Sequence, residues 1–292
     1  MAETVLPGVI DRHVHLGLAD ATRLANSPVV EVHDLGWSPR QQLDWRRTPP
    51  DGLVVKAAGP FHTAPGGYPT GRPWAPRDAI RAVDSPAAAL AAVDDAIEHA
   101  YDALKVTLHT GMPLLADDAL TALVGAAHAA GLTVIAHTEG PGQAARAVAA
   151  GVDVLAHAPW TERVPDDVLR RGRHATWIST LAIHGPAEQS IAIDNIRRFR
   201  EAGGTVVYGT DMGNGPAPAG APAGAPAGVS VREIHLLEAA GLSGDDLLRA
   251  VLGPLDDQRP GRTLVSHLPH PASAAELVGW LTAARRTSEE SS

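Results

Sequence analysis

The sequence alternates between short apolar runs and Ala-rich stretches of helical periodicity along most of its length. Continuous apolar runs are typical of strands that are buried on both faces of a parallel sheet. We expect strands at residues 9–16, 29–35, 53–58, 104–109, 133–137, 154–157, 175–179 and 205–209. We expect helices at residues 39–46, 87–101, 117–130, 143–150, 165–171, 186–202, 231–240 and 245–251. Eight strands alternating with eight helices predict an α/β protein with the architecture of a (β/α)8 TIM barrel. A doubly wound open sheet is the alternative, because periodicity does not show closure.

Composition restricts the partners and the chemistry. The chain has 292 residues, 45% of them hydrophobic, which is enough to build one large core. The formal net charge is −9 and there is no basic run, so we expect neither nucleic acid nor a membrane surface as a partner. The absence of cysteine excludes disulfides and thiolate zinc sites, so any metal must be held by His, carboxylate or modified Lys. No segment approaches the ~18 apolar residues of a membrane span. We therefore expect a cytoplasmic protein that acts on a small-molecule substrate.

Two stretches interrupt the alternation. Residues 59–77 are rich in Gly and Pro and predict a long loop after the third strand, and such loops in compact domains are mostly functional. Residues 215–228 form an Ala/Pro/Gly run that predicts an extended loop without a core. We expect one domain over residues 1–284 and a disordered tail over residues 285–292.

The first expected strand carries two histidines, and the fourth carries a lysine. His13 and His15 are two residues apart, so their side chains project from the same face of a strand and can bind one cation. Taken alone, a His-x-His is more often a chance occurrence or a pair that satisfies core hydrogen bonds. Lys105 lies in an apolar run, and the chain contains only one other lysine, Lys56. Burial depresses the pKa of an amine, and a neutral amine can take up CO2 to form a carbamate that bridges two metals. A structural ion pair is the alternative.

Three further candidates follow the ends of expected strands. His137 and His157 are separated by the length of one α/β repeat, which places them at equivalent positions on neighbouring strands. In a TIM barrel that position is the carboxyl-terminal rim, where active sites are built. Asp211 follows the eighth strand, which in a closed barrel lies beside the first. Loop capping is the alternative role for such an Asp.

Four other histidines, His33, His62, His109 and His184, lie at or just beyond strand ends. Each is a candidate for substrate binding or for a hydrogen bond to a metal ligand, and each is equally well explained as incidental.

Taken together, these residues resemble the metal-dependent amidohydrolase superfamily. The shared pattern is Pro-Gly-x-Ile-Asp-x-His-x-His at residues 7–15, Lys on strand four, His on strands five and six, and Asp on strand eight. The segments 30–36, 66–67, 136–140 and 150–157 resemble the prolidase and imidazolonepropionase-like branch most closely. The resemblance covers residues 5 to 253.

The resemblance implies a metal-dependent amidohydrolase that cleaves an amide, cyclic amide or dipeptide-like C–N bond. His13, His15 and Asp211 would hold the more buried of one or two divalent ions, and His137 and His157 the more exposed one. Carboxylated Lys105 would bridge both ions. Asp211 would accept the proton of the attacking hydroxide and pass it to the leaving group. The donor set suits Zn²⁺, with Mn²⁺ or Fe²⁺ as alternatives.

The chain departs from the family pattern at its ends and in its loops. Only six residues precede Pro7, and the usual C-terminal segment is reduced to about residues 262–266, so we expect the accessory β-sandwich to be absent or vestigial. The barrel edge this uncovers favours a homodimer. The family's Gly-Gly-His element reads Gly66-Gly67-Tyr68 here, which makes Tyr68 a candidate substrate-binding residue. A lyase, isomerase or cyclising enzyme, a lactone hydrolase or deaminase, and a non-catalytic binding barrel are the alternative functions.

Overall fold

The computed structural model describes residues 3–25, 27–50, 52–213, 228–257, 259 and 261–287. The strands are β1 (Thr4–Pro7), β2 (Val9–Val14), β3 (Val29–Asp34), β4 (Val54–Ala57), β5 (Phe61–Thr63), β6 (Ile80–Ala82), β7 (Ala103–His109), β8 (Thr133–Glu139), β9 (Val154–Leu155), β10 (Thr176–Ile178), β11 (Thr205–Val207), β12 (Thr263–Ser266) and β13 (Arg285–Arg286). The α-helices are α1 (Pro39–Arg47), α2 (Pro86–Glu98), α3 (Asp117–Ala129), α4 (Gln143–Ala150), α5 (Asp166–Arg171), α6 (Pro186–Glu201), α7 (Val231–Ala239), α8 (Gly244–Leu252) and α9 (Ala274–Ala283). The predicted strands are confirmed as β2, β3, β4 and β7 to β11, and the predicted helices as α1 to α8. None of the described helices is both long and apolar enough to cross a membrane.

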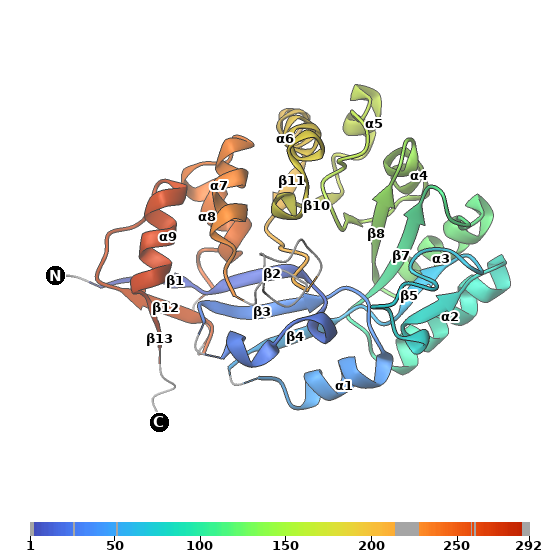
Figure 1. Ribbon diagram of the computed structural model, residues 1–292, viewed down its shortest axis with the longest axis horizontal. Helices are drawn as coiled ribbons and strands as arrows, with labels where there is room; N and C mark the ends of the chain where they lie inside the picture. The colour runs from blue at the N-terminus through green and yellow to red at the C-terminus, as the bar shows by residue number, and fades with distance from the viewer. Residues whose placement is uncertain are drawn as a thin grey trace.

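The strands form a mixed α/β fold that is mostly parallel. One parallel sheet has seven strands in the order β11-β10-β9-β8-β7-β5-β6, and a second has the order β2-β3-β4. Backbone hydrogen bonds join the two sheets: Arg12 N donates to Tyr208 O at 3.3 Å, and Asp102 N donates to Ala57 O at 2.8 Å. Helices α1 to α6 lie around the outside of the strands (Figure 1).

The strands bury both of their faces, which explains their continuous apolar sequences. A large core lies between the strands and the helices and includes Leu104, Val106 and Leu108 of β7. A second, smaller cluster consists of Leu35, Ala58, Ala103, Ile135, Ala156 and Ile178. Lys105 has only 1% of its surface exposed, and it alternates along β7 with the residues of the large core. Its side chain therefore lies on the opposite face of the strand from the helices.

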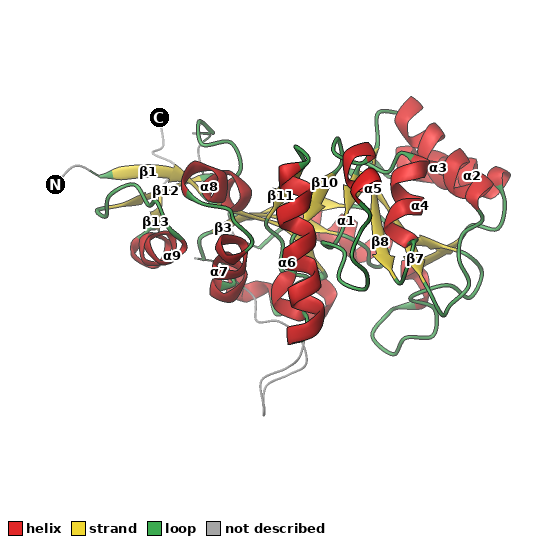
Figure 2. Cartoon of the chain, turned by 90° about the horizontal axis from the view of Figure 1, so that it is seen from above, coloured by secondary structure: helices red, strands yellow, loops and turns green. Residues whose placement is uncertain are grey.

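Both chain ends contribute to a third, antiparallel sheet of order β1-β12-β13, which packs beside α9 (Figures 1 and 2). The prediction of a disordered tail at residues 285–292 is therefore wrong for its first residues, because β13 pairs with β12 and Thr287 N donates to Thr263 O. The Arg286 guanidinium also donates to the carbonyl of Gly52 at 2.7 Å. These backbone and side-chain contacts join distant parts of the chain, so the local sequence does not reveal them. Residues 288–292 lie outside the described residues.

The Gly- and Pro-rich stretch at 59–77 is not a loop throughout. Phe61–Thr63 forms β5, which pairs in parallel with β7, and β6 follows shortly after the stretch. A three-residue strand bounded by Pro60 and turn residues gives almost no periodic signal, so it is visible only from its pairing with β7. The expected extended loop at 215–228 lies, except for Gly228, outside the described residues.

Candidate metal centre

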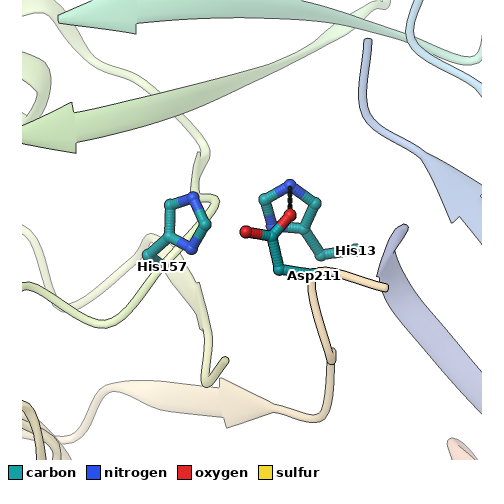
Figure 3. A group of neighbouring side chains, drawn as sticks. All are labelled: His13, His157 and Asp211. Carbon is teal, nitrogen blue, oxygen red and sulfur yellow. Dashed lines mark ion pairs between the residues drawn. The ribbon is translucent and has the colours of Figure 1, made fainter. Parts of the chain in front are cut away.

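Four of the predicted metal ligands meet at the carboxyl-terminal ends of the parallel strands. The Nε2 atoms of His13 and His15 each lie 3.3 Å from Oδ1 of Asp211. His157, which follows β9, joins them, and the ligand atoms of His13, His157 and Asp211 lie within 4.8 Å of one another. Figure 3 shows the three side chains pointing toward one another from separate segments of the chain. We call His13, His15, His157 and Asp211 the inner cluster.

Each imidazole of the inner cluster is oriented through its other ring nitrogen. Nδ1 of His13 lies 2.8 Å from the carbonyl oxygen of Ala156, and Nδ1 of His15 lies 3.1 Å from that of Gly36. A carbonyl oxygen only accepts, so in both rings Nδ1 carries the proton and Nε2 keeps its lone pair. Nδ1 of His157 lies 2.8 Å from the hydroxyl of Thr180. Metal-binding histidines are fixed in this way by a partner on the second nitrogen.

Asp11 holds the backbone on both sides of the inner cluster. It is fully buried, and its carboxylate accepts hydrogen bonds from the backbone of His13 at 3.2 Å and of Thr210 at 3.0 Å. The Thr210 hydroxyl donates to the same carboxylate at 2.5 Å. Asp211 follows with φ of +52°, a left-handed conformation that is uncommon for residues other than Gly. The side chain of Asp11 thus ties β2 to the segment that carries Asp211.

Burial keeps the imidazoles neutral. It lowers the pKa of His15 to about 3 and, despite Glu139 nearby, that of His137 to about 4. Burial also lowers the pKa of Lys105 to about 7, while Asp211 and Asp34 act in the opposite direction. Nε2 of His13 is buried and has no hydrogen-bond partner within the described ranges. Neutral imidazoles, a carboxylate and a buried nitrogen without a partner fit a divalent metal ion.

A second group of donor atoms lies on β7 and β8. Nδ1 of His109 lies 2.9 Å from Oε2 of Glu139, and Nε2 of His137 lies 3.3 Å from the same oxygen. The donor atoms of these three residues lie within 4.8 Å of one another. His137 also neighbours His157, with ring centroids 5.1 Å apart. We call His109, His137 and Glu139 the outer cluster. Glu139 was not predicted as a site residue.

Half-buried aromatic rings surround both clusters. Tyr68 stacks on His109 and His137 with centroid distances of 4.6 and 4.9 Å, which places this predicted residue at the site. Trp160 lies 5.1 Å from His157 and stacks on His184 at 4.7 Å, so His184 also lies at this end of the strands. Trp74 lies 6.1 Å from both His15 and Tyr68. The sequence analysis did not single out the two tryptophans. Two signals could have found them: only 4% of the residues are aromatic, and Trp74 lies in the Gly- and Pro-rich stretch while Trp160 follows a strand end.

The structure does not bring His33 and His62 to this site. His33 Nε2 lies 2.7 Å from Oε1 of Glu31. His33, Arg12 and Lys56 line a cavity of about 380 Å³. The first residues of strands β7 to β10 line the same cavity, which therefore lies at the opposite end of these strands from the inner cluster. The Nδ1 atom of His62 lies 3.0 Å from the carbonyl oxygen of Lys105. Burial lowers the pKa of His62 to about 4, and the charged residues that influence it lie on β6 and α2, on the helix side of the sheet.

Comparison with known proteins yields matches in structure and none in sequence. No protein-family profile and no curated protein matches the chain. A Xaa-Pro dipeptidase with methionine bound in its active site superposes with a TM-score of 0.72 at 18% identity, over 97% of this chain and 84% of the dipeptidase. Ochratoxinase from A. niger superposes with a TM-score of 0.72 at 16% identity, over 96% of this chain and 81% of that enzyme.

A putative prolidase from Bifidobacterium longum superposes with a TM-score of 0.68 at 22% identity, over 91% of this chain and 76% of its own. At these identities the likeness is one of fold. The fold that the resemblance predicted is thus the fold that this chain shares with these solved structures.

Proposed function

We propose that the protein is a metal-dependent hydrolase that cleaves an amide, cyclic amide or dipeptide-like C–N bond. One observation carries the proposal: the buried imidazoles of His13, His15 and His157 are each oriented through Nδ1, while Nε2 of His13 and of His15 faces the carboxylate of Asp211. The similarity in fold to a Xaa-Pro dipeptidase and to ochratoxinase supports the same reaction class.

In this proposal the inner cluster holds a divalent ion, for which Zn²⁺ suits the donors best. When bound, such an ion lowers the pKa of a water molecule and polarises the scissile carbonyl group. Asp211 takes the proton from the attacking water and delivers it to the leaving nitrogen. The amine of Lys105, with a pKa of about 7, is available in neutral form to react with CO2 and become a carboxylate ligand. We also propose that the two parallel sheets close into a (β/α)8 barrel, which would place the active site at the carboxyl-terminal rim.

The aromatic residues at the rim provide the substrate surface in this proposal. The rings of Trp74, Tyr68 and Trp160 each lie beside a histidine of one of the two clusters, with ring centroids 4.9 to 6.1 Å apart. Rings in these positions offer an apolar wall to the substrate groups on either side of the scissile bond. His184, stacked on Trp160, adds a polar edge.

The experiment is a screen of dipeptides, N-acyl amino acids and cyclic amides with the zinc-loaded protein, read by mass spectrometry. A mass gain of 18 Da marks net addition of water and separates hydrolysis from elimination, isomerisation or cyclisation. Chelation should abolish turnover, and zinc should restore it. Asp211→Asn should retain the fold and lower turnover by about 100-fold or more, because the proton acceptor is lost. Full activity of metal-free protein, or of Asp211→Asn, would show that the mechanism is wrong.

A further inference from the structure

Of the outer cluster, His137 belongs to the ligand pattern that the motifs indicated, whereas His109 and Glu139 do not. Its residues stand at the ends of neighbouring parallel strands, and the register pairs His109 with Glu139 and Thr107 with His137. Glu139 is two residues beyond His137 on β8, so the two side chains project to the same side. Three donor atoms thus converge from two adjacent strands.

Two buried imidazole nitrogens of the outer cluster face a single carboxylate oxygen. Nδ1 of His109 and Nε2 of His137 are both inaccessible to solvent, and among the described residues neither has a hydrogen-bond partner apart from the Glu139 carboxylate. Both lie close to Oε2 of Glu139, at 2.9 and 3.3 Å, so this one carboxylate oxygen is the polar neighbour that the two nitrogens share. Two buried nitrogens that converge on one carboxylate oxygen form a donor set that a cation can bind.

The spacing of the donors fits a metal ion. With metal–ligand distances of about 2.1 Å, tetrahedral ligands stand about 3.4 Å apart, close to the two measured contacts. Tyr68 stacks on both imidazoles at interplanar angles of 8° and 19°, which holds the two rings nearly parallel. The side chain of Glu139 is 34% exposed, so one side of the cluster remains open. Three protein ligands with one open position are typical of a catalytic zinc site.

We infer that His109, His137 and Glu139 bind a second divalent metal ion, most readily Zn²⁺, with a water molecule or the substrate as its fourth ligand. This inference rests on the proposed function, because it assigns the ligands of the outer ion in a two-metal hydrolase. It differs from the expected pairing of His137 with His157, which here lies with the inner cluster.

Metal content of the full-length protein tests the inference without any substrate. Glu139→Gln and His109→Gln are compared with Glu201→Gln and His174→Gln, which replace exposed residues of the same types. Each protein is loaded with zinc, desalted and measured by plasma mass spectrometry, and affinities are measured by competition with a chelator. The two cluster variants should either lose one zinc per chain or bind the second zinc ion more weakly. Loss of a ligand's hydrogen-bond partner typically raises the Kd by about 10–100-fold, and loss of the ligand itself should raise it by more. The control variants should match the wild type.

Anomalous diffraction at the zinc edge from wild-type crystals provides a test that needs no variant to fold. A peak between Nδ1 of His109, Nε2 of His137 and Oε2 of Glu139 supports the inference. Unchanged zinc content together with unchanged zinc affinity in both cluster variants, or a peak that places the outer ion on His137 and His157 without Glu139, overturns it. Zinc at the outer cluster in a protein that hydrolyses no amide would sink the proposed function alone. Amide hydrolysis with zinc only at the inner cluster would sink this inference alone.

Discussion

The hydrogen bond between Thr180 and His157 allows a sharp test of how the inner cluster is oriented. Thr180 is fully buried, has φ of +45°, and places its hydroxyl 2.8 Å from Nδ1 of His157. A β-branched residue in the left-handed region is strained by about 1–3 kcal/mol, which persists only where the surroundings determine it. We therefore infer that the surrounding residues hold Thr180 in this conformation, in which its hydroxyl fixes the imidazole of His157.

The informative substitution is Thr180→Val, which keeps the shape and the strain but removes the hydroxyl. It leaves Nδ1 of His157 buried without a partner, which should lower the free energy of unfolding by about 1–3 kcal/mol. The imidazole is then free to rotate, and zinc affinity should fall by about 10–100-fold. Thr180→Ser is the matched control, because it keeps the hydroxyl and loses one methyl group, at a cost of about 0.8 kcal/mol.

Urea denaturation of the metal-free protein measures the first effect, and zinc competition with a chelator measures the second. The two variants should separate: Thr180→Ser should lose some stability but bind zinc as tightly as the wild type, whereas Thr180→Val should be impaired in both. If Thr180→Val folds and binds zinc with wild-type affinity, the orientation argument is wrong.

Two further predictions concern residues outside the metal ligands. Asp11→Ala should destabilise the metal-free protein by about 1–3 kcal/mol for each of the two buried N–H groups that it leaves without an acceptor, and Asp11→Asn by less; equal losses in urea denaturation would contradict this. Burial raises the pKa of Glu31, but hydrogen bonds from His33 and Arg262 outweigh it and lower that pKa to about 2. A depressed pKa stabilises the fold above the unfolded value of about 4.3 and loses this effect as the pH falls through 2. Glu31→Gln should therefore be less stable than the wild type by on the order of 3 kcal/mol above pH ~5, with the difference disappearing toward pH ~2; a difference that does not change with pH would rule out the ion pair as its cause.

Much of the fold could be predicted from local sequence. Strands buried on both faces require continuous apolar runs, and the eight runs read from the sequence correspond to β2, β3, β4 and β7 to β11. Periodicity also places His13 and His15 on one face of a strand, because alternate residues share a face in any strand. The position of His157 at a strand end follows from the repeat length in the same way.

Contacts between distant segments could not be predicted in this way. The outer cluster depends on the register that sets His109 beside Glu139, and register is a relation between two strands that neither sequence contains alone. Likewise, β5 and β13 are too short to give a signal and exist because β7 and β12 pair with them.

His33 shows the limit most clearly. Like the metal ligands it is a histidine near the end of an apolar run, yet it binds Glu31 and lines the cavity at the opposite end of the strands. The sequence by itself determined which residue types lie on strands and which faces they share. Only the tertiary structure decided which of them meet, because strand pairing and the stagger between neighbouring strands set the height of each side chain.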